Sequence, residues 1–186
     1  PIAKFAWNSG APTLDLGVPL TGNTGTRVIN GVRTYGEFAY TAGNFAIAAQ
    51  NTVYKMPLDT TNLASGVSIA NTSQITIGRS GYYKIIISLQ AAITTHAVGQ
   101  FDFWLQKNGS DVANSCTQID LLKDQKCVIA MDWLVQSNGS DYFEIAYASG
   151  HLNYADILFP TVASQTSPYA RPGTPALIVN VIPIGV

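Results

Sequence analysis

Strand-length apolar runs that end at Asn-Gly pairs constrain the fold of this chain more than any other feature of its sequence. Between Gly81 and Tyr147 these runs are rich in Ile, Val, Tyr, Phe and Trp, which favour extended strands because they pack well on a pleated surface. The pairs Asn108-Gly109 and Asn138-Gly139 follow two of the runs, and such pairs accept the successive positive φ values of a tight hairpin. The segment therefore predicts antiparallel β-structure.

Turn signals recur about every ten residues after Gly36, and no segment shows the period of a helix. This spacing predicts one all-β domain with the architecture of a sandwich, a jelly roll or a barrel. The expected strands are Glu37–Tyr40, Phe45–Ala48, Thr52–Met56, Gln74–Ile77, Tyr82–Ala92, Gln100–Lys107, Val112–Leu121, Lys126–Gln136, Asp141–Ala148 and Pro175–Ile184.

Two of the expected strands are apolar on both faces. In Gln100–Lys107 apolar residues alternate with others that are mostly polar, so one face of that strand must belong to the core. In contrast, Tyr82–Leu89 and Ala176–Ile184 carry apolar residues on both sides, and such a strand is normally covered on both sides. In a chain of 186 residues the second cover is most easily another subunit. The sequence therefore predicts an oligomer.

Residues 1–35 differ in composition from the rest, because Gly, Thr, Asn and Pro separate short apolar islands. We expect an extended N-terminal arm here, followed by the β domain at 36–186. The arm carries Phe5, Trp7, Leu14 and Leu16, and each large apolar side chain contributes about 1.5 to 3 kcal/mol when it leaves water. These side chains are therefore expected to pack on the domain or on a partner. A floppy linker is the alternative, although linkers usually carry Ser, Lys and Glu instead.

Charged residues are scarce and nearly balanced in sign. They make up 11% of the chain against 47% hydrophobic residues, with a net charge of -1, whereas an ordinary soluble domain has about a quarter charged residues. No run of Lys or Arg offers the clustered cations that nucleic acid or an acidic membrane requires. The sequence also lacks an apolar stretch of about 20 residues and the plan of a signal peptide. These features favour a protein that is made in a cytoplasm and binds neither nucleic acid nor membrane.

The sequence offers no recognisable catalytic constellation. His96 and His151 are its two histidines, and neither has Asp, Glu or Cys at metal-ligand or catalytic spacing in its own segment. Asp102 and Asp132 could face one another on neighbouring strands as the carboxylate pair of a glycosidase, although a solvated or hydrogen-bonded role is commoner for such residues. No phosphate-binding glycine loop, nucleophile elbow or zinc signature is present. We therefore expect no enzymatic activity and no cofactor.

The two cysteines, Cys116 and Cys127, are too few for a disulfide framework and have no metal-ligand spacing. Both are expected to be small buried residues. A hairpin turning near Leu121–Lys123 would place them opposite one another, so a cross-strand disulfide remains the alternative. Asp120 with Asp124 is only a weak candidate for calcium, which prefers several carboxylates in one loop, and we expect no metal site.

The order of these segments resembles the tumour necrosis factor-like jelly roll. The resemblance rests on the Gly81-Tyr82-Tyr83 start of a long apolar strand, the Phe101–Gly109 strand and turn, and the Gly139–Ile145 strand. It covers residues 36–186 and is strongest for the versions found in bacteriophage virion proteins. The fold that it implies is an all-β antiparallel jelly-roll sandwich with an extended N-terminal arm.

Members of this family are compact homotrimers whose inner sheets pack around a threefold axis, so the resemblance implies a homotrimer here. The Gly-x-Tyr start resembles the family segment whose tyrosine points to that axis, and the C-terminal strand resembles the other strand that lines it. The residues that would form the trimer interface are Tyr83, Ile85, Ile87, Leu177, Val179 and Val181.

The resemblance also narrows the function. The chain has no collagen-like Gly-X-Y repeat and no expected membrane anchor, which separates it from the collagen-stalked proteins and the signalling cytokines and leaves the virion group. Within that group we expect a capsid decoration, or cement, protein on the outer capsid surface. It would stabilise a phage head by clamping neighbouring subunits of the major capsid protein, with Phe5, Trp7, Leu14 and Leu16 of the arm as the contacts.

The alternative is the receptor-binding tip of a phage tail or head fibre. Such a tip would bind a host surface glycan or receptor through loops such as His96–Gly99 and Ser149–Tyr154. A fibre tip usually follows a long stalk of heptads or repeats, whereas this chain has only a short arm with aromatic residues. The sequence therefore favours the cement protein.

Overall fold

The chain divides into two units, Pro1–Val32 and Arg33–Val186. The computed structural model describes residues 4–8, 11–15, 34–93, 95 and 97–185. In the first unit, strands β1 (Lys4–Asn8) and β2 (Ala11–Asp15) form an antiparallel pair. The sequence predicted an extended arm in this region, and its described part contains this two-stranded sheet.

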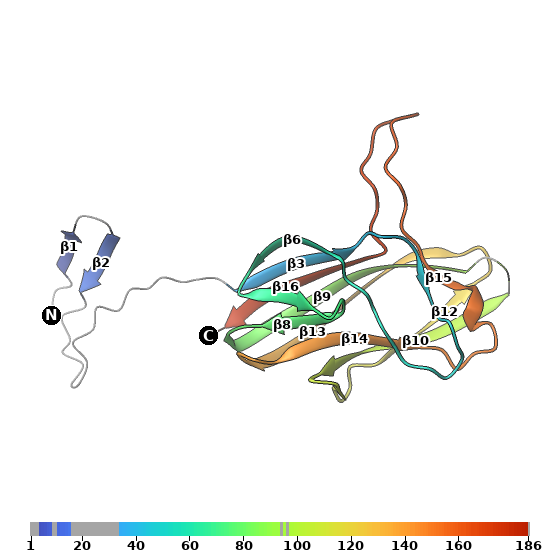
Figure 1. Ribbon diagram of the computed structural model, residues 1–186, viewed down its shortest axis with the longest axis horizontal. Helices are drawn as coiled ribbons and strands as arrows, with labels where there is room; N and C mark the ends of the chain where they lie inside the picture. The colour runs from blue at the N-terminus through green and yellow to red at the C-terminus, as the bar shows by residue number, and fades with distance from the viewer. Residues whose placement is uncertain (1–3, 9–10, 16–33, 94, 96, 186) are drawn as a thin grey trace. The chain divides into compact units, whose positions relative to one another are not determined.

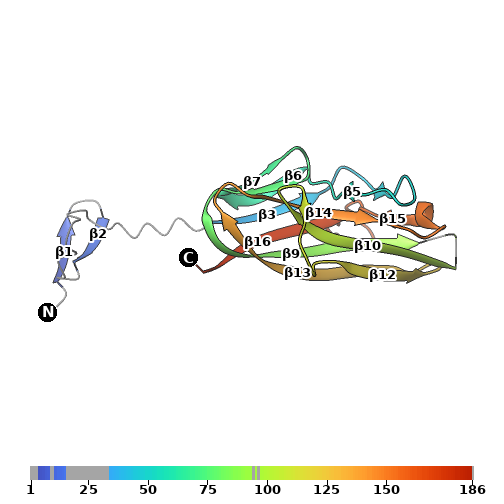
Figure 2. The ribbon, with the colours of Figure 1, turned by 90° about the horizontal axis from the view of Figure 1, so that it is seen from below.

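The second unit is a sandwich of two antiparallel sheets whose long strands run along its length (Figures 1 and 2). In sheet I the main strands follow the order β13, β9, β16, β3, β6, and β15 pairs with the last residues of β9 and with β4. The strands of sheet I are β3 (Tyr35–Tyr40), β4 (Phe45–Ala46), β6 (Thr60–Ser65), β9 (Ser80–Ile93), β13 (Lys126–Asn138), β15 (Ile157–Phe159) and β16 (Leu177–Gly185).

Sheet II is centred on β10 and β14. The hairpin strand β11 and strand β12 both pair with β10, while β14 pairs with β5 and with β8, which is followed by β7 at the edge. The strands of sheet II are β5 (Tyr54–Lys55), β7 (Val67–Ala70), β8 (Gln74–Ile77), β10 (Val98–Lys107), β11 (Ser110–Asp111), β12 (Thr117–Leu122) and β14 (Tyr142–Ala148). The described residues otherwise contain only a 3-10 turn, η1 (Tyr154–Asp156), so the all-β class is confirmed.

The core fills the space between the two sheets. The alternation in β10 is as predicted, because Phe101, Phe103 and Leu105 are fully buried. At one end of the core the Phe159 ring stacks on Phe45 at 4.7 Å and meets the edge of Phe101 at 5.1 Å. Such aromatic pairs add about 0.5 to 1.5 kcal/mol beyond the burial of their area. The core therefore joins strands of both sheets into one unit.

The two Asn-Gly turns are linked by one buried carboxylate. Asp141 accepts hydrogen bonds from the Asn108 side chain at 2.7 Å and the Asn138 backbone N–H at 2.8 Å, and it pairs with Lys107 at 2.8 Å. Burial alone would raise the pKa of Asp141, but the bonds from Lys107, Asn108 and Asn138 lower it below its ordinary value. The carboxylate therefore stays ionised and ties the turn after β10 to the turn after β13.

Only the first of these turns forms a hairpin as predicted. Asn108 and Gly109 both have positive φ, and they join β10 to β11. The Asn138-Gly139 turn instead leads from β13 in sheet I to β14 in sheet II. The prediction of a hairpin at this second turn is therefore wrong, because residues that allow a tight turn do not determine whether the flanking strands pair.

Several expected strands change their bounds. The expected Val112–Leu121 strand begins only at Thr117, because the chain first turns through Asn114, which has positive φ. The sequence analysis also missed β6, β7 and β15. Most of the side chains of β6 are exposed, so it carries no clear alternation of apolar and polar residues.

Candidate functional site

The outer face of sheet I carries several large apolar side chains that are exposed in the single chain. On β9, β13 and β16 every second side chain points away from the core, and the register places these side chains next to one another: Lys84 lies opposite both Leu134 and Ile182. We call this surface the assembly face. It comprises Tyr82, Lys84, Ile86, Ser88 and Gln90 of β9, Val128, Ala130, Asp132, Leu134 and Gln136 of β13, and Ile178, Asn180, Ile182 and Ile184 of β16.

Large apolar side chains on the assembly face are exposed to water in the single chain. Leu134 is 70% exposed and Val128 58%, and Tyr82, Ile182 and Ile184 are also exposed. Leu134 and Ile182 flank Lys84, whereas Val128 lies opposite Gln90. Scattered exposed apolar residues are ordinary, and larger groups of them on one face are typical of surfaces that interact with another molecule. This face therefore exposes several large apolar side chains that its neighbours in the sheet leave uncovered, and its role is a matter for proposal.

The charges on the assembly face are paired with each other. Lys84 Nζ lies 3.0 Å from Asp132 Oδ2, and both side chains are partly exposed. A partner that covers this face desolvates a neutral pair instead of an isolated ion, which costs less because each charge keeps its counter-ion. Lys84 and Asp132 therefore add no net charge to the apolar contact area of this face.

The residues predicted to form the trimer interface lie on the other side of the same strands. They are buried inside the single chain, with at most 2% of each side chain exposed, and the set is Tyr83, Ile85, Ile87, Leu177, Val179 and Val181. A side chain already enclosed between the two sheets has no surface to offer to another copy. The prediction that these side chains line contacts between copies is therefore wrong. Both faces of β9 are apolar, so its own alternation does not identify the core face.

Part of the arm's predicted contact set lies in described strands. Phe5 and Trp7 belong to β1 and Leu14 to β2, and the register places Phe5 opposite Leu14. Leu16 lies outside the described residues. That these residues contact a capsid stays a prediction.

The structure does not bring together the candidate catalytic carboxylates. Asp102 alternates with buried Phe101 and Phe103 on β10, so it lies on the outer face of sheet II. Asp132 lies on the outer face of sheet I beside Lys84. The core separates the two carboxylates. The hypothesis that they face one another as the carboxylate pair of a glycosidase is therefore wrong.

The histidines and cysteines are also separate. His96 lies outside the described residues, and His151 accepts a hydrogen bond from the backbone N–H of Asn153 at 3.2 Å within its own loop. Cys116 and Cys127 are free thiols, because β12 pairs with β10 and β13 with β9 and no β12–β13 hairpin forms. Cys116 is exposed, against the expectation that both cysteines are buried. The described part of the chain holds no cluster of three or more His, Cys, Asp or Glu side chains suited to a metal ion.

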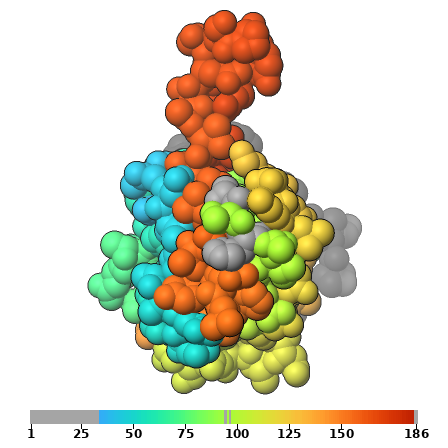
Figure 3. Space-filling model, turned by 90° about the vertical axis from the view of Figure 1, so that its right-hand side faces the viewer, coloured from blue at the N-terminus to red at the C-terminus, as the bar shows by residue number. Residues whose placement is uncertain are grey.

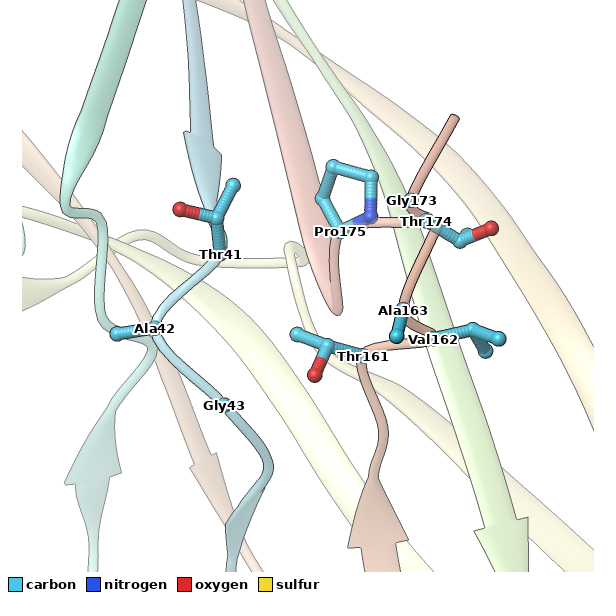
Figure 4. Close-up of a pocket in the computed structure, with 9 residues that line it drawn as sticks. All are labelled: Thr41, Ala42, Gly43, Thr161, Val162, Ala163, Gly173, Thr174 and Pro175. Atoms are coloured by element: carbon cyan, nitrogen blue, oxygen red, sulfur yellow. The ribbon is translucent and has the colours of Figure 1, made fainter. Parts of the chain in front are cut away.

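A long hairpin at 160–176, between β15 and β16, rises from the sandwich (Figures 1 and 3). Its two legs are joined by backbone hydrogen bonds between Val162 and Thr174, and its tip exposes Tyr169. A pocket of about 470 Å³ lies at its foot, between both legs and the segment after β3 (Figure 4). The described residues that line the pocket are neutral and mostly small, so they offer no acid, base or nucleophile for catalysis beyond threonine hydroxyls.

The fold is that of a tumour necrosis factor-like jelly roll. The chain is similar in structure to Eiger TNF from S. frugiperda, with a TM-score of 0.52 over 82% of this chain and 92% of that chain, at 9% sequence identity. This likeness confirms the predicted jelly-roll sandwich and shows the fold alone. It does not support the bacteriophage virion type, which is taken up below as a proposal.

No family model and no curated protein matches the sequence. In the described part of the chain, no helix has the length and apolar character needed to cross a membrane.

Proposed function

We propose that this chain is a non-enzymatic structural protein of a virion that assembles as a homotrimer and decorates a bacteriophage head. It would lie on the outer capsid surface, after synthesis in the host cytoplasm, and would stabilise the head by clamping neighbouring subunits of the major capsid protein. The observation that carries the proposal is the uncovered apolar assembly face of sheet I, because a face of this kind is stable in water when another protein covers it.

Identical copies are suitable partners for the assembly face. Its one ion pair, Lys84 with Asp132, is satisfied within the chain, so two such faces can approach without the repulsion that a surface of one charge sign would cause. The threefold arrangement comes from the resemblance to tumour necrosis factor-like proteins. In this arrangement the outer face of sheet I, and not its buried side, contacts the neighbouring copies.

The arm supports an attachment role. Its β1–β2 pair belongs to a unit separate from the jelly roll, so the arm can bind a capsid surface while the jelly roll forms the trimer. Three arms on one trimer would act together, since binding of the first raises the effective concentration of the others. Weak individual contacts therefore suffice for stable attachment.

The test is to locate and count the protein on purified phage particles. Quantitative mass spectrometry and immunogold labelling should find hundreds of copies, spread over the head surface. A receptor-binding tip would give tens of copies or fewer at a tail or fibre end, and that result would overturn the cement proposal in favour of the alternative.

A truncated protein tests the role of the arm. Removal of residues 1–32 leaves the jelly-roll unit, which begins at Arg33, so the truncated protein should still form trimers but should no longer bind heads that lack the protein. Full decoration by the truncated trimer would show that the jelly roll, and not the arm, makes the capsid contact.

A further inference from the structure

A hollow beside Trp104 distinguishes the outer face of sheet II. Its volume is about 330 Å³ and its lining includes Asp102, Asp111, Asn114 and Ala148. This size lies near the lower end of the range for small-molecule sites, about 300 to 1,000 Å³. The hollow is therefore large enough for one compact polar ligand.

Trp104 is held in place by a chain of hydrogen bonds. Its indole Nε1 donates to Asp111 Oδ1 at 2.6 Å, and the Gln106 side chain donates to the same oxygen at 2.7 Å. Lys55 Nζ donates in turn to the side-chain oxygen of Gln106. Because these residues come from three strands, β5, β10 and β11, the indole edge is fixed from several directions before any ligand binds.

The neighbours of Trp104 on β14 are small. Ala146 lies directly opposite Trp104 in the register and is fully buried, and Ala148, two residues further along, lines the hollow. A large side chain in place of Ala148 would take up part of the hollow. The half-buried ring thus forms one wall of a hollow that small residues leave open.

Hydrogen-bond acceptors surround this wall. Asp102 Oδ1 accepts from the Gln118 side chain at 3.0 Å, and each carboxylate has two oxygens with about four acceptor positions, so Asp102 and Asp111 retain capacity for further donors. Asp102 and Asp111 both line the hollow. Hydrogen bonds from Gln106 and the indole, and then the charge of Lys55, lower the pKa of Asp111. The lining is therefore rich in acceptors and holds two carboxylates, with the Lys55 ammonium behind Asp111.

We propose that the hollow beside Trp104 binds one neutral sugar residue of a surface glycan. A pyranose ring has an apolar face of C–H groups, which packs on an aromatic ring, and an edge of hydroxyl donors, which suits carboxylate acceptors. Acidic sugars and nucleotides carry negative groups that Asp102 and Asp111 repel. A quaternary ammonium ion is favoured by a cage of several aromatic faces, whereas the indole is the only aromatic side chain among the described lining residues.

This inference does not depend on the proposed capsid role. The hollow lies on the outer face of sheet II, and the core separates it from the assembly face of sheet I. Covering the assembly face therefore leaves the hollow accessible, and an assembly of several copies would bind a glycan-bearing surface more strongly than one copy does.

The first test is binding of the full chain to a glycan array that carries neutral, sialylated and sulfated glycans. We expect signal on a set of neutral glycans and a loss of signal when the same glycans carry sialic acid or sulfate at the bound residue. An array with no bound neutral glycan, or with preference for acidic glycans, would overturn the proposal.

The second test assigns the binding to the hollow. With the best neutral glycan as probe, calorimetry should show a loss of affinity of at least about tenfold for Trp104→Ala, as for other central aromatic contacts. Trp104→Phe keeps an aromatic wall and should retain most of the affinity, while Asp102→Asn tests the acceptor. Leu63→Ala, at an exposed leucine of β6 outside the hollow, is the control for general effects.

The outcomes of the second test are distinct. Unchanged affinity in Trp104→Ala, with an unchanged melting temperature, would place the glycan elsewhere and refute the assignment. Binding of choline in place of sugars, lost in the same variant, would mean that the hollow takes cations and would also overturn the proposal. Neither result bears on trimer formation, which is measured separately by sedimentation.

Discussion

Replacement of Leu134 by glutamine should dissociate the trimer and leave the jelly roll folded. Leu134 is 70% exposed in the single chain, so covering it in an assembly adds most of the about 1.5 to 3 kcal/mol that a buried leucine contributes, or about 1 to 2 kcal/mol. Burial of an amide without partners costs about 1 to 3 kcal/mol more. The change therefore removes about 2 to 5 kcal/mol per copy and about 6 to 15 kcal/mol per trimer.

Glutamine is a sharper replacement here than a charged residue. Lys84 lies directly opposite Leu134 across the β9–β13 ladder, so a carboxylate at position 134 could pair with it and weaken the effect. A lysine would face a like charge and would strain the single chain as well as the assembly. The neutral amide changes the assembly face without either complication.

Sedimentation velocity at micromolar concentration is the appropriate assay, combined with circular dichroism to monitor the fold. We expect a trimer for the unmodified protein and a folded monomer for Leu134→Gln. Leu152→Gln, at a leucine that is 82% exposed in the loop after β14, should remain a trimer. Ile85→Gln, on the buried side of β9, should instead unfold the chain.

Two results would refute the reasoning. A trimer of undiminished stability in Leu134→Gln would show that the assembly face is not the interface. If the unmodified protein sediments as a monomer, the proposal of a homotrimer is refuted. The apolar face would then require a different partner.

Three further predictions concern the single chain. Asp141→Asn should lower the free energy of unfolding by about 1 to 3 kcal/mol, because Lys107 loses its ionic partner. The pKa of Asp141 is lowered in the folded protein. The ionised carboxylate therefore contributes to the free energy of unfolding at pH values above the unfolded-state pKa, and this contribution is lost as the pH falls through the folded-state pKa. Denaturant titrations of Asp141→Asn at several pH values should lack this part of the acid sensitivity. Phe159→Ala should cost about 3 to 5 kcal/mol, measured by chemical unfolding, because the ring is fully buried. Burial raises the thiol pKa values of Cys116 and Cys127, so both should react slowly with iodoacetamide at neutral pH and faster as the pH rises; fast labelling at neutral pH would contradict this.

The fold was predictable because its strongest signals are local. The alternation of Phe101, Phe103 and Leu105 with residues of the outer face determined the core face of β10, and the structure buries all three. The Asn108-Gly109 pair correctly predicted a hairpin, since both residues adopt the required positive φ. Such features depend on a few neighbouring residues, so they can be predicted without knowing how the rest of the chain packs.

The buried and exposed sides of β9 were not predictable from that strand alone. In β9 both faces are apolar, so Tyr83 and Ile86 look equally suitable for a core. The deciding information lies in the partner strand β13, where Trp133 and Val135 are buried while Asp132 is exposed. An interpretation that paired β9 with β13 and placed Asp132 in water would have identified Tyr83 as buried and Ile86 as outward-facing. The hollow of sheet II has one signal in the sequence, a tryptophan on the mainly polar face of β10. This residue alone does not predict a hollow, because Asp111 and Asn114 of the next segment also line it.

The central position of β16 in sheet I has a consequence for how the chain is made. β16 lies between β9 and β3, and Val181 is opposite Ile85 on one side and Gly36 on the other. On a ribosome, β3 and β9 therefore emerge long before the strand that joins them, and each must wait with an unpaired edge. The sheet is complete only once residues 177–185 have been made, and a chain without them would keep two edges available to bind other chains.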